Sequence, residues 1–270
     1  MRFAKGHGTE NDFVILPDPD GALDLYPRLV ARLCDRRAGL GADGVLRVVR
    51  TDSAADSGWF MDYRNADGST AEMCGNGIRV FARYLLDRGM LAGGEFTVGT
   101  RAGPRAVRVE PGGITAQMGM PEVLGTGRAS VGGRVCEGVR ISVGNPHLAC
   151  LVDEPLDKFD LTVAPELDPR QFPEGGNVEL VRVIGRAAVQ MRVRERGSGE
   201  TRSCGTGAVA AAVAAARAAG ESTGAWRVGV PGGDLTVTLD AHTSWLTGPA
   251  VIVAEGELCE SWLSAAQVRK

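Results

Sequence analysis

Lysine and histidine are scarce in this chain of 270 residues, with three of each, and aromatic residues make up only 5% of it. No apolar run is long enough for a membrane-spanning helix, which needs about 20 residues. The basic residues are scattered and the net charge is −3, so neither a nucleic-acid groove nor a basic membrane-binding patch is indicated. The N-terminus also lacks the apolar stretch of a signal peptide. These absences favour a cytoplasmic protein that binds neither nucleic acid nor membranes.

Metal sites and disulfides are not indicated either. The histidines, His7, His147 and His242, are too dispersed for a metal site, and the sequence has no Cys-Xaa-Xaa-Cys pair. An even number of cysteines, six here, would favour disulfides in a small secreted domain. In a long chain without a signal peptide we expect thiols instead. We therefore expect no bound metal and no disulfide framework.

Two of the cysteines, Cys74 and Cys204, begin Cys-Gly-Xaa-Gly motifs that are 130 residues apart. Each motif leads into a run with helical character, at 75–87 and 205–219, and a glycine follows each run at the position where helices commonly end. The sequence therefore predicts two helices, each with a cysteine directly before its first residue.

The similarity extends well beyond the motifs. At the same offset of 130, Met61 falls on Met191, and the run 96–99 falls on 226–229. Two unrelated segments could share a short motif by chance, but a strand, a glycine turn and a second strand at one register indicate an internal duplication. Two copies of this length are too few and too long for a solenoid.

We predict an α/β fold of the α+β type, with two similar domains that are each a curved antiparallel β-sheet or barrel around a central helix. The run 208–216 supports this interpretation, because a helix of small side chains suits close enclosure by strands. The expected domains are 1–125, which carries Cys74, and 126–270, which carries Cys204. One option for the C-terminal tail is a return to the first domain.

A cysteine directly before a helix lies at a position that favours a reactive thiol. The helix N-terminus carries roughly half a positive charge, which favours a thiolate. Its first N–H groups also bind carboxylates. The backbone groups in question belong to Gly75, Asn76, Gly205 and Thr206. Two such thiols could act on one carbon, where one removes a proton and the other returns a proton to the opposite face.

This chemistry commonly uses pyridoxal phosphate bound to a lysine. The three lysines, Lys5, Lys158 and Lys270, lie in no recognisable cofactor context. We therefore expect a reaction without a cofactor, in which the helix N-termini, positioning and exclusion of water supply the stabilisation.

Several motifs resemble those of the diaminopimelate epimerase family. The run 195–207, ERGSGETRSCGTG, resembles the second signature of that family, and 65–69 with 73–77 resembles the first. The opening run 5–13 and the segment 144–147 also fit. The resemblance implies two similar domains, conversion of LL-diaminopimelate to the meso form without a cofactor, a role in lysine and peptidoglycan biosynthesis, and a homodimer.

The resemblance also implies roles for individual residues. Cys74 and Cys204 would be the acid–base pair, and Cys74 would attack the LL isomer. His147 and Glu195 would tune the pKa values of the thiols. Glu195 and the backbone of Arg196 would hold the reacting ammonium group. The distal end of the substrate would be bound by Asn11, Asn65, Asn145, Asn177 and the Arg196 guanidinium.

One position departs from the family pattern. Many members carry Gln after the Asp that corresponds to Asp43, whereas this chain has Gly44. The asparagines also have a simpler interpretation as turn residues with local hydrogen bonds, and this applies most strongly to Asn65 and Asn177.

Four other functions stay open. Proline racemases and hydroxyproline epimerases resemble this fold, but their first motif has His where this chain has Asn76. Phenazine-pathway isomerases of similar fold lack the cysteine pair. A thiol redox protein would form a reversible disulfide between Cys74 and Cys204, and a binding module would need neither thiol.

Overall fold

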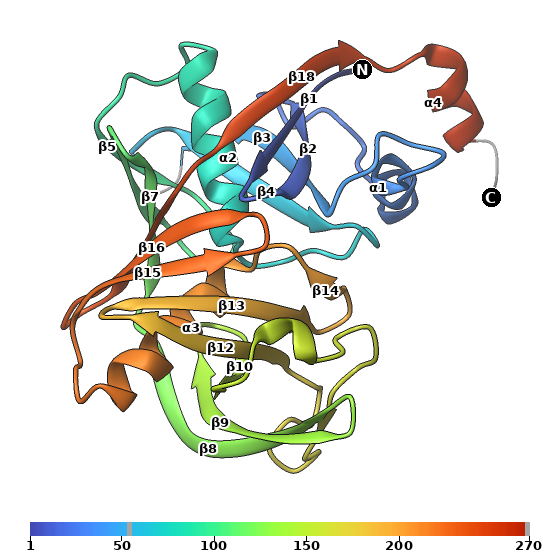
Figure 1. Ribbon diagram of the computed structural model, residues 1–270. Coiled ribbons are helices and arrows are strands. Elements are labelled where there is room, and N and C mark those ends of the chain that lie inside the picture. Colours follow the sequence, from blue (N-terminus) through green and yellow to red (C-terminus); the bar gives the residue numbers. More distant parts are fainter. Residues whose placement is uncertain (53–55, 268–270) are drawn as a thin grey trace. The chain divides into compact units, whose positions relative to one another are not determined.

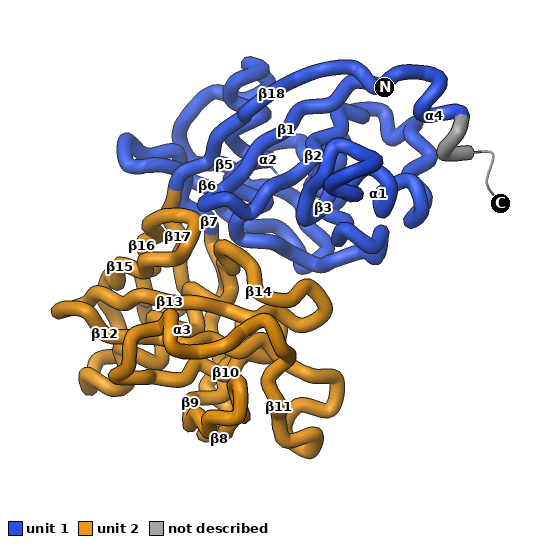
Figure 2. Tube along the Cα trace, turned by 45° about the vertical axis from the view of Figure 1, so that its right-hand side comes forward, with its two compact units in different colours: residues 1–116, 249–270 blue, residues 117–248 orange. Residues whose placement is uncertain are grey.

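The computed structural model describes residues 1–52 and 56–267, and the chain forms two compact units (Figure 2). Unit 1 contains Met1–Ala116 and Pro249–Lys270, and unit 2 contains Gln117–Gly248. The unit boundary lies between Ala116 and Gln117, whereas the sequence placed a domain boundary after residue 125. The last strand of the chain pairs with the first, so the C-terminal segment returns to unit 1.

Unit 1 has one sheet with the strand order β18-β1-β2-β3-β4 and a smaller group with the order β7-β6-β5. The strands are β1 (Arg2–Gly8), β2 (Asn11–Pro17), β3 (Gly44–Arg50), β4 (Trp59–Asn65), β5 (Glu95–Val98), β6 (Arg105–Glu110) and β18 (Val251–Glu257). Strand β7 (Gly113–Gly119) runs across the unit boundary. The helices are α1 (Pro27–Cys34), α2 (Gly75–Asp87) and α4 (Glu260–Gln267).

Helix α2 is the centre of the larger apolar core of unit 1 and packs against strands β1, β2, β3, β4 and β18 (Figure 1). The approach to β1 is close. A Cβ atom on Gly6 would lie only 2.8 Å from the Val251 carbonyl oxygen and 3.0 Å from Val80 Cγ1. Glycine at this position therefore allows the strand to lie directly against the helix.

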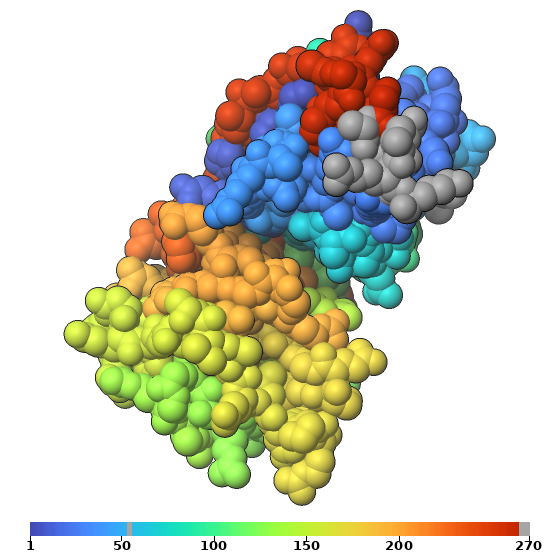
Figure 3. All heavy atoms as spheres, turned by 90° about the vertical axis from the view of Figure 1, so that its right-hand side faces the viewer, coloured from blue at the N-terminus to red at the C-terminus, as the bar shows by residue number. Residues whose placement is uncertain are grey.

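A second apolar cluster of unit 1 includes residues of α1 and of the C-terminal segment. The Trp262 indole N–H donates to the Ala38 carbonyl oxygen at 3.0 Å. The Arg32 guanidinium lies 4.6 Å from the centre of the same ring. Figure 3 shows the C-terminal segment in red against the blue N-terminal part of the chain. These contacts hold α4 to α1 in unit 1.

Unit 2 has the strand order β11-β8-β9-β10-β12-β13-β15-β16-β17, with β14 paired to β13. Its strands are β8 (Glu122–Val131), β9 (Arg134–Ser142), β10 (Pro146–Leu151), β11 (Glu166–Leu167), β12 (Asn177–Gly185), β13 (Ala188–Glu195), β14 (Gly199–Thr201), β15 (Gly224–Val230), β16 (Gly233–Leu239) and β17 (Ser244–Gly248). Its helices are the short η1 (Leu156–Lys158) and α3 (Gly205–Ala218). Helix α3 packs against β9, β10, β12, β13, β15, β16 and β17 (Figure 1).

The two units repeat one topology. In unit 1, β1 and β2 are antiparallel, β2 and β3 parallel, and β3 and β4 antiparallel. Strands β9, β10, β12 and β13 of unit 2 follow one another with the same directions. Met61 and Met191, which the offset of 130 relates, are both buried. The predicted α+β fold with internal duplication is confirmed.

The sheets differ in one respect from a purely antiparallel arrangement. Parallel neighbours include β2 with β3, β10 with β12, and β13 with β15. A parallel pair needs a crossover connection rather than a hairpin. Helix α1 lies in the connection between β2 and β3 and supplies this crossover in unit 1.

The two central helices bury different surfaces. Helix α2 buries large side chains such as Ile78, Phe81 and Leu85, whereas α3 buries almost only alanine and two valines. Small side chains let strands approach a helix on several sides, as the sequence predicted for this run. The space around the central helix is therefore filled by large side chains in unit 1. In unit 2 it is closed by strands whose backbones lie close to the helix.

Candidate functional site

Cys74 and Cys204 are the N-cap residues of α2 and α3. Both have extended backbones, with φ −139° and ψ 119° for Cys74 and φ −127° and ψ 120° for Cys204. Each sulfur accepts a hydrogen bond from the N–H three residues later, at 3.3 Å from Gly77 and 3.4 Å from Gly207. The two motifs therefore fold alike, and each places a sulfur at the positive end of a helix.

Glycine at the last position of each motif leaves room for a neighbouring side chain. A Cβ atom on Gly77 would lie 3.2 Å from Leu46 Cδ2, and one on Gly207 would lie 2.9 Å from Glu179 Oε1. The same point of the repeat thus faces an apolar side chain in unit 1 and a carboxylate in unit 2. We call the surroundings of the two sulfurs the Cys74 half-site (Asn11, Cys74, Asn76, Arg79) and the Cys204 half-site (Asn145, His147, Glu179, Glu195, Cys204, Thr206).

Asn11 lies beside the start of α2. Its Oδ1 is 3.8 Å from Cys74 Sγ and accepts a hydrogen bond from Asn76 Nδ2 at 3.1 Å. Its Nδ2 donates to Asp43 Oδ2 at 2.8 Å, which fixes the orientation of the amide. Thr9 and Glu10 form the tight β1–β2 turn with positive φ angles of 48° and 62°. The turn thereby carries Asn11 to the Cys74 half-site.

Arg79 is a functional candidate that the sequence analysis missed. It is fully buried, and its Nη1 donates to the Gly75 carbonyl oxygen at 3.1 Å. Its Nη2 would lie 3.1 Å from a Cβ atom on Gly8, so the absence of a side chain on Gly8 makes room for it. Burial lowers the pKa of Arg79 to about 10, and attraction to Cys74 opposes that change. A charged guanidinium here favours the thiolate of Cys74.

The surroundings of Cys204 are anionic. Its sulfur lies 3.5 Å from Thr206 Oγ1, and Glu195 accepts a hydrogen bond from it. Burial raises the pKa of the Cys204 thiol well above its ordinary value, and the carboxylates of Glu195 and Glu179 raise it further. Burial also raises the pKa of Glu195, against the hydrogen bonds from Thr201 and Cys204. This half-site favours the protonated form of its cysteine.

His147 connects two residues of the Cys204 half-site. Its Nδ1 is 2.7 Å from Glu179 Oε1, and its Nε2 is 2.9 Å from Asn145 Oδ1. His147 and Glu179 are both fully buried. The parallel pairing of β10 and β12 places them together, with His147 opposite Asn177.

Glu179 is a second site residue that the sequence analysis did not predict. The available signal was a carboxylate inside the apolar run 178–181, because a charged side chain is almost never fully buried unless it is paired. That signal marks Glu179 as unusual but does not identify its partner, since His147 lies 32 residues earlier.

Asn177 and Arg196 lie together in unit 2. Asn177 Oδ1 accepts from the Arg196 backbone N–H at 2.9 Å, and its Nδ2 donates to the Pro146 carbonyl oxygen at 3.0 Å. Asn145 and Arg196 both line a hollow of about 250 Å³. The hollow is bordered by Gly144, Asn145, Pro146, Gln171, Phe172, Pro173, Glu174, Gly175 and Arg196. Three of the residues predicted for the distal end of a substrate thus lie in one region.

Asn65 makes local hydrogen bonds. It is the last residue of β4 and leads into a tight turn, where its Nδ2 donates to Ser69 Oγ at 2.9 Å and its backbone N–H donates to the Ser69 carbonyl oxygen at 2.9 Å. Gly44 pairs with Asn65 across β3 and β4. A Cβ atom on Gly44 would lie 2.6 Å from the Arg64 carbonyl oxygen, so this backbone leaves no room for the Gln of other family members.

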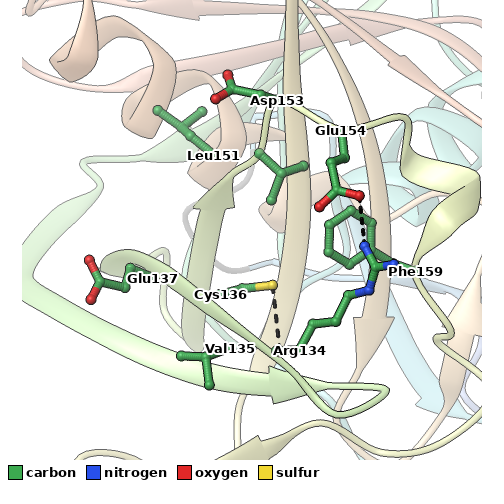
Figure 4. Close-up of a pocket in the computed structure, with 9 residues that line it drawn as sticks. Arg134, Val135, Cys136, Glu137, Leu151, Asp153, Glu154 and Phe159 are labelled. Carbon is green, nitrogen blue, oxygen red and sulfur yellow. Dashed lines mark hydrogen bonds and ion pairs between the residues drawn. The ribbon is translucent and has the colours of Figure 1, made fainter.

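A larger hollow of unit 2, about 600 Å³, contains none of the predicted site residues (Figure 4). Arg134 lines it, pairs with Glu154 at 2.7 Å and lies over the Phe159 ring at 5.4 Å. Cys136 also lines it, but burial raises the pKa of that thiol, which disfavours the reactive form. We therefore place the candidate groups at the start of α2 in unit 1 and at the start of α3 in unit 2, and not at this larger hollow.

Two absences concern the part of the chain that the structure describes. No cluster of three or more His, Cys, Asp or Glu side chains there is arranged to hold a metal ion. Among the same residues, no helix is both long and apolar enough to cross a membrane. The six cysteines, all of them described, form no disulfide with one another.

Solved structures with the same fold include several proteins of low sequence identity. A phenazine biosynthesis protein of the PhzF family from Bacillus anthracis matches with a TM-score of 0.77 at 19% identity, over 96% of this chain and 99% of that one. A hydroxyproline epimerase from Agrobacterium vitis matches with a TM-score of 0.67 at 15% identity, over 99% and 98%. These similarities establish the fold alone.

Sequence relatives establish the family. The family model for diaminopimelate epimerase matches residues 3–124 and 139–257. The diaminopimelate epimerase of Thermobifida fusca is 59% identical over 96% of this chain and 98% of its own length. That of Rhodococcus opacus is 53% identical over 97% and 98%. The resemblance seen in the motifs is confirmed, and the chain belongs to the diaminopimelate epimerase family, a family of isomerases.

Proposed function

We propose that this isomerase converts LL-2,6-diaminopimelate to the meso form, without a cofactor, by proton transfer to and from the α-carbon. The observation that carries the proposal is the matched pair of cysteines, each the N-cap of a helix and each accepting an N–H bond on its sulfur. The product would serve lysine and peptidoglycan biosynthesis.

In the proposed mechanism one thiolate removes the α-proton and the other thiol delivers a proton to the opposite face. The α-carbon of an amino acid is a weak acid, so the charge that develops on the substrate carboxylate must be stabilised. The first N–H groups of α2 and α3 can do this as preorganised donors. These belong to Gly75, Asn76, Gly205 and Thr206. Glu195 and the backbone of Arg196 would hold the reacting ammonium group.

Recognition of the distal end would depend on the hollow beside Arg196. Diaminopimelate carries a second amino-acid group, which needs a cation for its carboxylate and acceptors for its ammonium group. The guanidinium and the asparagine amides of this region supply both kinds of partner. Asn145 and Arg196 line the hollow and Asn177 is bonded to Arg196, and we propose that Asn11 and Asn65 contribute to the same task.

The electrostatics support a direction for the reaction. The buried Arg79 beside Cys74 favours a thiolate there, and the carboxylates beside Cys204 favour a thiol. We propose that Cys74 is the base toward the LL isomer and Cys204 the acid, with the roles exchanged in the reverse direction. His147 and Glu195 would adjust the acidity of the thiols.

Two further parts of the proposal concern the assembly and its location. Like other members of its family, the protein would act as a homodimer. A cytoplasmic location suits a site that needs two reduced thiols, because the cytoplasm keeps cysteines reduced. Sedimentation velocity of the purified protein would test the dimer directly.

The experiment that tests the reaction is proton NMR of LL-diaminopimelate with reduced enzyme in D₂O. Loss of the α-proton signal together with appearance of the meso isomer is the expected result. Exchange with hydroxyproline or proline but not with diaminopimelate would retain the proton transfer and overturn the substrate. Absence of exchange with all three would overturn the proposed reaction.

A further inference from the structure

Gly44 lies where many members of the family carry a glutamine, so this chain has no amide side chain at that position. A Cβ atom on Gly44 would lie 2.8 Å from Tyr63 Cε2, closer than a Cβ atom approaches another heavy atom in proteins. The ring of Tyr63 therefore occupies the space in which a side chain at position 44 would begin. The absence of a side chain on Gly44 is what admits the ring.

Gly44 and Tyr63 lie on the face of the sheet that α2 covers (Figure 1). In the antiparallel pair of β3 and β4, Tyr63 is opposite Leu46, and Gly44 is opposite Asn65. Leu46 Cδ2 lies 3.2 Å from the position of a Cβ atom on Gly77, at the start of α2. Residues two apart on a strand share a face, so position 44 and Tyr63 also face this helix.

The ring of Tyr63 leans toward the end of the sheet that carries predicted substrate-binding residues. Its direct cross-strand partner is Leu46, but its Cε2 atom reaches Gly44, a diagonal neighbour. Gly44 lies in one row with Asn65 on β4 and Phe13 on β2. Because the ring carbon next to Cε2 carries the hydroxyl, the hydroxyl lies at this end of the ring.

Phe13 supports the ring of Tyr63. The two rings meet edge to face, with their centres 6.0 Å apart and an angle of 79° between their planes. Phe13 is fully buried, whereas Tyr63 and Cys74 are partly buried residues that pack against the same core cluster. Asn11, two residues before Phe13 on the same face of β2, has its Oδ1 atom 3.8 Å from Cys74 Sγ. The phenol thus lies between an apolar support and the Cys74 half-site.

We propose that Tyr63 is a specificity-determining residue that takes the place of the missing glutamine, with its hydroxyl bound to the distal amino-acid group of diaminopimelate. The inference rests on the proposed function, because it needs a substrate with a second charged end. A hydroxyl has one donor and two acceptor sites, so it can bond a carboxylate or an ammonium group while it keeps a partner in the protein. The ring is also rigid and loses less rotamer freedom on binding than a glutamine side chain does.

A purely structural role for Tyr63 would require its ring but not its hydroxyl. The ring fills the space above Gly44 and packs against Phe13, and a phenylalanine ring would do both. Removal of the hydroxyl alone therefore separates recognition of the substrate from packing of the core.

The decisive variant is Tyr63→Phe, with Tyr26→Phe as its matched control. The Tyr26 hydroxyl is buried and has no hydrogen-bond partner among the residues that the structure describes, and Tyr26 caps α1. In Tyr63→Phe, the KM for LL-diaminopimelate should rise about tenfold, because the lost hydrogen bond is to a charged group. The value of kcat should change little, since the distal contact is the same before and during proton transfer.

The Tyr26→Phe control should have the kinetic constants of the parent. Parent constants in Tyr63→Phe would overturn the proposal. A fall in kcat at unchanged KM would also overturn it, because that result would indicate a disturbed Cys74 half-site and not a lost distal contact.

Binding without turnover gives a second measurement. The Cys74→Ala protein should hold LL-diaminopimelate without converting it, so titration calorimetry can report the dissociation constant. Adding Tyr63→Phe to Cys74→Ala should raise that constant about tenfold. Equal dissociation constants in the two proteins would contradict the role of the hydroxyl.

Gly44→Ala tests whether the hydroxyl depends on the space above Gly44. The added methyl group would lie 2.8 Å from Tyr63 Cε2 and 2.6 Å from the Arg64 carbonyl oxygen, so the ring must shift. The KM should rise in Gly44→Ala, and it should not rise further when Gly44→Ala is added to Tyr63→Phe. Additive effects would contradict the proposal. If Gly44→Ala does not fold, the Tyr63→Phe measurements still decide the matter.

Failure of this inference and failure of the proposed function are distinguishable. Epimerisation of diaminopimelate by the parent, with the same KM in Tyr63→Phe, would retain the proposed function and remove the role of Tyr63. Exchange with proline or hydroxyproline but not with diaminopimelate would overturn both, because those substrates have no distal amino-acid group. Circular dichroism of each variant establishes that it is folded.

Discussion

The two half-sites have the same backbone conformation and differ in the charge of their side chains. In both, a cysteine caps a helix, its sulfur accepts an N–H from a glycine, and that glycine allows a neighbouring strand to come close. In the Cys74 half-site, the guanidinium of Arg79 is buried and interacts with Cys74, and the side chain facing Gly77 is Leu46. Around Cys204 the buried charges are carboxylates, and Glu179 faces Gly207.

This difference shows how a duplicated unit can serve a reaction that needs two unlike groups. A two-base epimerisation needs one thiolate and one thiol at the same time. The repeated helix start supplies the same anion-binding geometry twice, so the distinction between base and acid must come from the side chains behind it. A cation favours the thiolate in one copy and carboxylates favour the thiol in the other.

The largest expected effect comes from removing either sulfur. Cys74→Ala and Cys204→Ala should each lower the rate of epimerisation by about a thousandfold, because general acid–base catalysis contributes about 10² to 10⁴. The measurement is conversion of LL to meso substrate, and of meso to LL, followed by NMR. Cys259→Ala is the matched control, since that cysteine is exposed and far from either helix start in sequence. Epimerisation at close to the parent rate in either site variant would rule out a two-base scheme.

Glu195→Gln should lower activity without lowering the stability of the fold at neutral pH. Activity should fall by about a hundredfold, because the amide of the variant cannot ionise and is a weaker acceptor for the Cys204 thiol than a carboxylate. Burial raises the pKa of Glu195, so the folded protein holds this proton more tightly than the unfolded chain does. That contribution to stability is present at low pH and is lost as pH rises through the raised value.

Because Gln cannot ionise, the Glu195→Gln protein should be at least as stable as its parent at neutral pH, with the difference vanishing in acid. Urea unfolding at two pH values, together with the epimerase assay, tests this. A variant that is both inactive and strongly destabilised at neutral pH would indicate that Glu195 is needed for packing instead.

Arg79→Met should have a smaller, pH-dependent effect on the Cys74 half-site. Loss of a nearby opposite charge should raise the pKa of the Cys74 thiol, and a change of about one pKa unit lowers activity about tenfold at neutral pH. Activity should recover as pH rises, because more thiolate then forms. The pH profile of kcat/KM measures this directly.

Arg79→Lys retains a cation at the same position and is the control for the Arg79→Met variant. A loss of activity in Arg79→Met that is equal at every pH would show that the guanidinium acts through packing against Gly8 and Gly75 rather than through its charge.

The sequence predicted those parts of the site that depend on local patterns. The cysteine motifs, the predicted helix at 75–87 and the repeat at an offset of 130 are all visible along the chain, and the observed α2 has the same bounds. The α3 helix ends at Ala218, one residue before the predicted end. Helix starts are encoded locally by capping residues and glycines, which is why these elements could be placed without a structure.

The residues that distinguish the half-sites depend on tertiary pairing. Glu179 meets His147 only because β10 and β12 pair in parallel, and no local pattern specifies that pairing. Arg79 looks like an ordinary helical arginine in sequence, and its burial follows from Gly8 on a distant strand. Asn65 was expected to bind substrate, but whether its local bonds to Ser69 are exchanged for such contacts stays a prediction.

The smallest expected effect concerns the stability of the turn that supports the Cys74 half-site. Asp12 lies next to Asn11 and accepts from Lys5 Nζ at 2.6 Å and from Arg36 Nη2 at 2.8 Å. Although burial opposes it, these hydrogen bonds and charges lower the pKa of Asp12 to about 2. The stabilisation is therefore present above the usual pKa of 3.8 and is lost as pH falls toward 2.

Asp12→Asn should lower the free energy of unfolding by about 1 to 2 kcal/mol at neutral pH, after allowance for solvent screening at a half-buried site. The matched control in unit 2 is Asp160→Asn, because that carboxylate also accepts local hydrogen bonds but lies in an exposed loop, and it should change stability little. Urea unfolding at neutral pH and near pH 2.5, between the two pKa values of Asp12, measures both variants. If the Asp12→Asn deficit does not shrink in acid, the aspartate stabilises the turn by its shape and not by its charge, and unit 1 has no greater sensitivity to acid than unit 2.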